Sequence, residues 1–285
     1  MKKFVVNTYE IKQKKTGLPS GFLRFAFLTD YHNASDGADH DRILAAIREM
    51  EPDAILCGGD MIVGKPDHSV DPARRLMLAL ADRYPVFHGT GNHEYRTRIY
   101  PETYPGMYEA YRRPLEEAGV IFLENTCARI QIRQLPVTIY GFDMDRFYYH
   151  RFKRRRLPLQ EMEDSLGEVD GQGVSILLAH NPAQMDTYLA WGADLTLCGH
   201  YHGGIMGLGE HRGLISPDFR LFPANAHGLF RKNDSFLLVG AGLGEHTLPL
   251  RIHNPRELIE VKVNIRGADE EGEITDGDSG EASGL

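Results

Sequence analysis

The sequence predicts an α/β protein in which short buried strands alternate with amphipathic helices. Short apolar runs alternate with segments whose apolar residues recur at helical spacing. Residue types that bind metal ions stand directly after several of these runs. The chain has 285 residues, of which 42% are apolar and 25% charged, so it is long enough for one large domain. Repeated strand–helix–strand units favour a sheet that is covered by helices.

The first half of the chain contains three of the expected strands and three helices. Asp71 and Pro72 are expected to open the second helix, with Asp71 as its N-cap and Pro72 in its first helical position. In order, we expect strand 24–29, helix 39–50, strand 53–57, the helix that begins at 71, strand 85–88 and a helix carrying Tyr108, Tyr111 and Leu115.

The second half changes character, with more strands and shorter helices. It begins with a predicted hairpin of strands 128–133 and 137–142, joined by a turn at 134–136. The further expected elements are strand 174–179, helix 183–190, strand 194–198 and strands 235–240 and 258–265. Because no interior segment has the composition of a linker, residues 1–266 are predicted to form one domain.

Charge is unevenly distributed along the chain. Thirty-two Lys and Arg residues oppose 40 Asp and Glu residues, which gives a net charge of −8. Residues 267–285 contain seven acidic and no basic residues, so the rest of the chain carries −1. This acidic tail has almost no large apolar side chains and is predicted to be disordered. Since a clear basic excess is usual in nucleic-acid-binding proteins, we expect no duplex nucleic acid as a partner.

The sequence contains no pattern that predicts export or membrane insertion. The apolar stretch 4–6 is too short for the core of a signal peptide, and no run approaches the ~20 apolar residues of a membrane helix. Three widely spaced cysteines, Cys57, Cys127 and Cys198, argue against a disulfide framework. We therefore expect a cytoplasmic protein with free thiols.

Metal-ligand residue types follow five of the predicted strands. Because ligands of open α/β sheets bind at the carboxyl ends of the strands, we expect these clusters to line one crevice. A D-x-H triplet or a Gly-Asp turn is common by itself, so the ordered set is the specific observation. In chain order, the clusters are Asp30-Tyr31-His32, Gly58-Gly59-Asp60, Gly91-Asn92-His93-Glu94, His180 and Gly199-His200-Tyr201-His202.

The candidate metal ligands include two carboxylates, four imidazoles and one amide oxygen, with no thiolate. Such a set suits Mn²⁺, Fe or Zn²⁺, and we expect Mn²⁺. Seven ligands are more than one tetrahedral site takes, but they suit two divalent ions that share a bridging carboxylate. The seven residues are Asp30, His32, Asp60, Asn92, His180, His200 and His202.

The ordered motifs D-x-H, G-D, G-N-H-E, H and G-H-x-H resemble those of the calcineurin-like metallophosphoesterases, over about residues 16–265. The stretches HYHGG at 200–204, VGAGLG at 239–244 and PLRIHNPREL at 249–258 are similar to one bacterial subgroup. That subgroup includes cell-envelope phosphodiesterases and enzymes that cleave the pyrophosphate of UDP-2,3-diacylglucosamine. The resemblance implies a four-layer α-β-β-α sandwich of two mixed sheets, with a dinuclear metal site at the C-terminal ends of the strands. Ala183, Tyr201 and Ile205 depart from the subgroup's pattern, which bears on the substrate rather than on the metal site.

The resemblance also implies a role for each candidate residue. Asp60 would bridge the two ions, and His93 would protonate the leaving oxygen. The first ion would be held by Asp30, His32 and His202, and the second by Asn92, His180 and His200. Glu94 would either orient His93 or cap the following turn.

The implied reaction is hydrolysis of a phosphoester, expected to be a lipid- or nucleotide-linked phosphodiester or pyrophosphate, by in-line attack of a metal-activated water. Two alternatives remain from the sequence. One is a metal-dependent nuclease, and the other is a non-catalytic binding scaffold with the same fold.

Residues 146–156 (RFYYHRFKRRR) combine aromatic and basic side chains. They form either a solvated basic surface, paired with the acidic tail, or a surface that engages an anionic substrate or membrane. In the second interpretation, Arg151 to Arg156 would bring the protein to the inner face of the membrane. His88, His227 and His253 lie outside the metal-ligand pattern and are expected to be surface or strand histidines.

Overall fold

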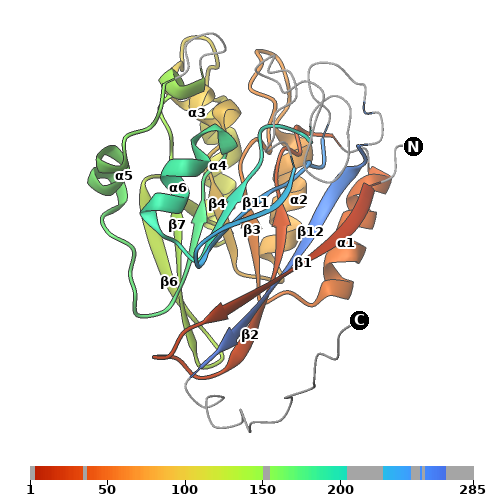
Figure 1. Ribbon diagram of the computed structural model, residues 1–285. Helices are drawn as coiled ribbons and strands as arrows, with labels where there is room; N and C mark the ends of the chain where they lie inside the picture. The colour runs from red at the N-terminus through yellow and green to blue at the C-terminus, as the bar shows by residue number, and fades with distance from the viewer. Residues whose placement is uncertain are drawn as a thin grey trace, which may run out of the picture.

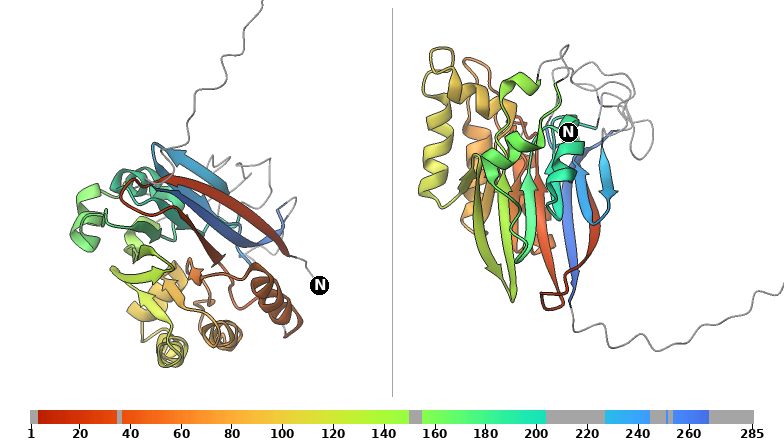
Figure 2. Two further views of the ribbon diagram at one scale, coloured as in Figure 1. Left: turned by 90° about the horizontal axis from the view of Figure 1, so that it is seen from below. Right: turned by 60° about the vertical axis from the view of Figure 1, so that its left-hand side comes forward.

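Two six-stranded sheets pack face to face in the computed structural model of the protein, and helices cover the outer face of each (Figure 1). The structure describes residues 4–34, 37–149, 155–203, 227–244, 251 and 254–267. The end-on view in Figure 2 shows the helices on opposite sides of the paired sheets. The expected four-layer α-β-β-α arrangement with mixed sheets is therefore confirmed.

The first sheet joins the two ends of the described chain. Its strands β2 to β5 are parallel, whereas β12 is antiparallel to β2 and parallel to β1. The strand order is β1 (Phe4–Lys14), β12 (Arg256–Arg266), β2 (Gly21–Leu28), β3 (Ala54–Cys57), β4 (Val86–Gly89) and β5 (Ile121–Leu123). The helices on its outer side are α1 (Gly37–Met50), α2 (Asp71–Ala81) and α4 (Met107–Glu117), and α3 (Asn92–Ile99) follows β4.

The second sheet is parallel at its centre and antiparallel at both edges. Its strand order is β10 (Gly228–Lys232), β11 (Ser235–Val239), β9 (Leu195–Cys198), β8 (Val174–Leu178), β7 (Leu135–Gly141) and β6 (Thr126–Ile132). Helices α5 (Leu159–Leu166) and α6 (Met185–Trp191) cover it, and short 3₁₀ helices span Arg146–Tyr149 and Pro182–Gln184.

The main core lies between the two sheets, where their inward-facing side chains interdigitate. Phe27, Leu56, Ile176 and Leu197 are among its fully or almost fully buried members. Burying a side chain of this size stabilises the fold by about 1.5–3 kcal/mol. Two further clusters attach the helices to the outer faces of the sheets. This packing fixes the positions of the strand ends on which the candidate site is built.

Two local predictions were wrong. Val70, not Asp71, is the N-cap of α2, and the Asp71 carboxylate instead accepts a hydrogen bond of 2.6 Å from Arg74. The hairpin turn is shorter than expected, because Leu135 and its neighbour Pro136 already belong to β7. Arg133 makes the tight turn in the left-handed region, with φ +54°.

All three cysteines are free thiols, as the sequence predicted. Within the described ranges, no helix combines the length and the apolar character needed to cross a membrane. Gly267, the first residue of the predicted tail, donates a hydrogen bond to Ser20 Oγ, and residues 268–285 lie outside the described part.

His88 is a fully buried histidine of β4. Its Nε2 lies 2.9 Å from the Tyr111 hydroxyl, and its ring stacks on Phe122 with the centroids 4.6 Å apart. Burial lowers its pKa from 6.5 to about 4. As the pH falls from 6.5 to 4, the unfolded chain therefore binds a proton before the folded protein does, and stability is lost over that interval.

We predict that protonation linked to His88 lowers the free energy of unfolding by about 2 kcal/mol as the pH falls from 7 to 5. His88→Phe keeps a flat ring against Phe122 but cannot titrate, so the variant should lose about 2 kcal/mol less over the same interval. Urea unfolding of both proteins at the two pH values, with a chelator present, measures the difference. Equal losses in the two proteins would contradict the burial argument.

Candidate metal centre

The five candidate clusters meet at one edge of the two sheets, which is uppermost in Figure 1. Asp30 follows β2, Asp60 follows β3 and Asn92 begins α3 just after β4. The second sheet contributes His180 after β8, and His200 with His202 after β9. The site therefore lies across the seam between the sheets, and neither sheet could form it alone.

Asp30, His32 and His202 form the first of three groups whose ligand atoms all lie within 4.8 Å of one another. His202 Nε2 lies 3.3 Å from Asp30 Oδ1 and 3.1 Å from His32 Nε2. The Asp30 carboxylate is fully buried and accepts hydrogen bonds from Thr29 Oγ1 (2.8 Å) and from the amide of His200 (3.0 Å). These bonds fix its orientation, as surrounding hydrogen bonds do for metal ligands generally.

Asp60, His180 and His200 form a second group of the same kind. His180 Nδ1 donates to the carbonyl of Gly58 at 2.7 Å, which turns Nε2 toward Asp60 Oδ2 at 3.2 Å. Burial opposes a charge on His180, but Asp60 and Asp30 outweigh it and raise its pKa to about 10. Burial likewise opposes the Asp60 charge, yet His93, His180 and His32 hold the pKa of that carboxyl well below its usual value.

The residues present fit divalent ions. Asn92 Oδ1 is buried and has no hydrogen-bond donor among the residues that the structure describes. A buried carbonyl oxygen without a donor is costly, and a cation would satisfy it. Carboxylate, imidazole and amide donors are also the mixed oxygen and nitrogen set that Mn²⁺, Fe and Zn²⁺ accept.

The backbone at the site is strained. The left-handed region is unfavourable for residues with a side chain and is often found at functional sites. Five of the seven predicted ligands occupy it, namely Asp30, His32, Asp60, His200 and His202, with φ between +48° and +67°.

His93 lies beside these groups and forms a third one with His32 and Asp60. Its Nδ1 accepts a hydrogen bond of 2.9 Å from the amide of Gly64 and lies 2.8 Å from the Arg96 guanidinium. Both neighbours are donors, so the ring proton belongs on Nε2, which lies 3.9 Å from Asp60 Oδ2. Burial, with Arg96 and the neighbouring imidazoles, lowers the pKa of His93 well below its ordinary value.

Glu94 makes the contacts of a cap. Its buried carboxylate accepts hydrogen bonds from the amides of Asp60 (2.8 Å), Met61 (2.7 Å), Ile62 (3.1 Å) and Gly91 (3.1 Å). It therefore caps α3 and also fixes the loop that carries Asp60, a role that the sequence did not indicate. Burial and the nearby Asp60 carboxylate raise its pKa to about 7.

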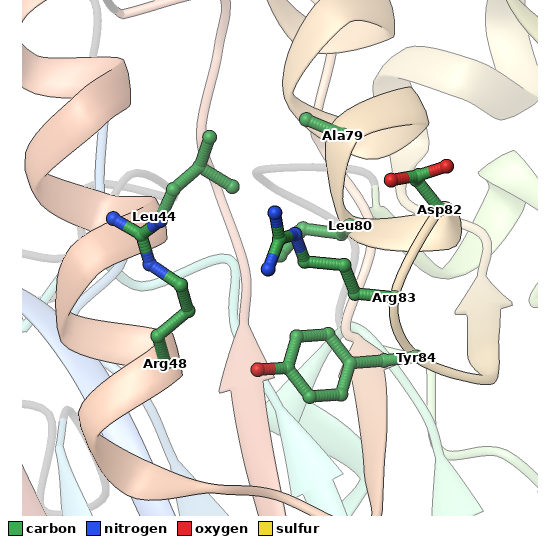
Figure 3. A pocket seen from close by; sticks show the side chains of 7 residues that line it. All are labelled: Leu44, Arg48, Ala79, Leu80, Asp82, Arg83 and Tyr84. Atoms are coloured by element: carbon green, nitrogen blue, oxygen red, sulfur yellow. The ribbon is translucent and has the colours of Figure 1, made fainter.

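Other candidate features lie apart from this centre. A cavity of about 220 Å³ between α1 and α2 is lined by Leu44, Arg48, Leu80, Arg83 and Tyr84, among others, and contains no predicted ligand (Figure 3). His227, outside the ligand pattern as expected, lies 3.1 Å from a Glu257 carboxylate oxygen. His253 and Ile205 lie outside the described residues.

The membrane contact of Arg151 to Arg156, one of the two interpretations of this segment, receives no support. Residues 150–154 lie outside the described part of the chain. The guanidinium of Arg155 lies 3.3 Å from the centre of the Phe147 ring, so this side chain is stacked on the protein's own surface.

Comparison with known proteins gives a consistent result. The family model described as calcineurin-like phosphoesterase matches residues 23–204. The uncharacterized metallophosphoesterase YkuE of Bacillus subtilis (strain 168) is 25% identical over 263 residues, which cover 87% of this chain and 82% of that protein. The uncharacterized metallophosphoesterase YkoQ of the same organism is 24% identical over 255 residues, which cover 89% of this chain and 88% of that protein.

Among solved structures, a candidate 5′-nucleotidase from Staphylococcus aureus is similar, with a TM-score of 0.50 and 12% identity. The match covers 78% of this chain and 49% of that one, so this chain spans about half of that protein's length. At this identity the likeness concerns the fold alone.

The contacts of Glu94 predict that it acts on metal binding without being a ligand. Glu94→Gln places an amide N–H₂ among four backbone donors, so the Asp60 loop should lose its fixed position. Loss of such a supporting contact typically weakens metal affinity about 10–100-fold. Calorimetric titration with Mn²⁺ measures the effect, and Glu117→Gln, at an exposed position, is the matched control. Unchanged affinity in Glu94→Gln would show that the loop holds its position without this carboxylate.

Proposed function

Because the chain belongs to the calcineurin-like phosphoesterase family and is a phosphoric ester hydrolase, we propose that it cleaves phosphodiester or pyrophosphate bonds with two divalent metal ions. The observation that carries this proposal is the overlap of the three ligand groups. Asp60 and His32 each belong to two of them, so the groups form one continuous cluster rather than separate sites.

In this proposal, Asp60 would contact both ions, because its carboxylate lies close to a residue of each ligand set. His32 and His180 lie 3.9 Å and 3.2 Å from its Oδ2. Asp30, His32 and His202 hold the first ion, and Asn92, His180 and His200 hold the second. When bound, two divalent ions would supply positive charge for the phosphoryl oxygens and would activate a water at neutral pH. Mn²⁺ is the ion we expect.

His93 is proposed to assist the leaving oxygen. Gly64 and Arg96 occupy its Nδ1, so the single ring proton lies on Nε2 and faces the cluster. These two donors disfavour a doubly protonated ring, so the neutral ring would present its Nε2–H as a hydrogen-bond donor to the leaving oxygen as negative charge develops there. A positioned histidine in such a role typically contributes about 10²–10⁴-fold to the rate.

Two other functions have less support. A nuclease is disfavoured by the net charge of −1 outside the acidic tail. A non-catalytic scaffold is disfavoured because all seven ligand positions carry metal-binding residue types and six of them fall into the overlapping groups of the cluster. Hydrolysis of bis-p-nitrophenyl phosphate, nucleotide sugars, glycerophosphodiesters and cyclic nucleotides with Mn²⁺ tests the proposal, and single-stranded DNA tests the nuclease. Activity on the small diesters or pyrophosphates is expected. Activity confined to DNA would identify a nuclease instead, and hydrolysis of none of these compounds would contradict the proposal.

The role of His93 gives a prediction that depends on the leaving group. His93→Ala should lower kcat by about two to four orders of magnitude for an alkyl phosphodiester, whose leaving oxygen needs a proton. For p-nitrophenol esters the loss should be smaller, since that oxygen leaves readily as an anion. Metal content should stay close to that of the wild type, because His93 is not a proposed ligand.

The exposed His68→Ala is the control and should behave like the wild type on both substrates. Equal losses on both substrates in His93→Ala would mean that His93 does not act on the leaving oxygen.

A further inference from the structure

The segment from Asp143 to Tyr149, which follows β7, runs alongside α3, the helix that begins with Asn92 and His93. Arg98 of α3 forms an ion pair with Asp143, and Tyr95 donates a hydrogen bond of 3.1 Å to Asp145. These contacts fasten the segment to the helix that carries two of the site residues. The first part of the basic and aromatic stretch is therefore held against α3, next to the candidate centre.

Tyr149 is the residue of this segment whose ring lies next to proposed ligands. Its ring centre lies 5.2 Å from that of His200, in an edge-to-face arrangement, and 6.5 Å from that of His180. Both histidines belong to the second ligand group. The phenol is thus placed beside the position proposed for the second ion.

The hydroxyl of Tyr149 differs from those of two nearby tyrosines. Tyr148 donates its hydroxyl proton to Glu161, and Tyr188 donates to the carbonyl of Asn181. Among the described residues, by contrast, no group forms a hydrogen bond with the Tyr149 hydroxyl. Tyr149 is half buried, and its hydroxyl is not among the buried polar atoms of the described residues that have no partner. The hydroxyl is therefore accessible to a molecule bound at the centre.

We propose that Tyr149 is a substrate-binding residue whose hydroxyl donates a hydrogen bond to a phosphoryl oxygen beside Asp60, His180 and His200. This inference rests on the proposed function. A phosphoryl oxygen is a negatively charged acceptor, and hydrogen bonds to charged acceptors are the stronger class. The same contact would persist with the product phosphate group, so inorganic phosphate can serve as a probe.

The test uses Tyr149→Phe, which keeps the ring against His200 and removes only the hydroxyl. With Mn²⁺ bound, its affinity for inorganic phosphate, measured by calorimetry, should fall about tenfold or more. Its kcat/KM for bis-p-nitrophenyl phosphate should fall about 10–100-fold, while its Mn²⁺ content stays that of the wild type. Tyr148→Phe is the matched control, since its hydroxyl contacts Glu161, and it should match the wild type in all three measurements.

The outcomes separate this inference from the function on which it rests. If the wild type is active and Tyr149→Phe is equally active and binds phosphate normally, this inference is overturned and the proposed function is not. The Tyr149 ring would then contribute only packing against His200. A loss of Mn²⁺ in Tyr149→Phe would also overturn the inference, because the residue would then support the ligands instead of the substrate. A wild type that hydrolyses none of the phosphoesters would overturn the proposed function and this inference with it.

Discussion

The buried carboxylate of Asp60 is the constraint on which the rest of the centre depends. It lies at the seam of two sheets, only 3% of its side chain is exposed, and His32, His93 and His180 surround it. A buried charge without a partner is strongly unfavourable, so the imidazoles, or ions that they help to hold, are needed for the carboxylate to remain there. Asp60 therefore couples the stability of this edge of the fold to its chemistry.

The surrounding backbone is adapted to this carboxylate. A Cβ on Gly91 would lie 2.2 Å from Asp60 Oδ1, so glycine at this position permits the close approach. The amide of His93 donates to the same oxygen at 2.8 Å, and Glu94 holds the amides of the Asp60 loop. The left-handed conformations of Asp60 and its neighbours in the cluster are maintained by such contacts, which rigid sheets on both sides can support.

The sequence predicted the central strands and the gathering of Asp and His residues at one edge, because both depend on local patterns. Buried parallel strands appear as continuous apolar runs, and the residues after them fall at one edge by topology alone. The pairing of the edge strands was harder to predict from the sequence. β1 alternates between exposed and buried residues and pairs with β12, some 250 positions away, so nothing local indicated its partner. Asp71 was predicted to be the N-cap of the helix because Asp followed by Pro is a common way for a helix to begin, but its carboxylate binds Arg74 instead.

Two contacts at the centre were missed for the same reason. The contacts of Glu94 with the Asp60 loop join residues more than 30 positions apart, and the position of Tyr149 beside His200 joins two different strand ends. The basic composition of 146–156 suggested an electrostatic role for the segment. In the described part of it, the contact with the centre is instead made by the aromatic ring of Tyr149. Sequence patterns predict which residue types gather, but the supporting contacts arise only from the packed fold.

The central claim is that two ions share the Asp60 carboxylate, and electron paramagnetic resonance of the Mn²⁺-loaded protein, combined with elemental analysis, tests it most directly. The account predicts about two Mn²⁺ per chain with an exchange-coupled signal. It also predicts that Asp60→Asn loses the coupling together with tight binding at both positions. A single uncoupled ion per chain in the wild type, or a coupled pair that survives Asp60→Asn, would contradict it.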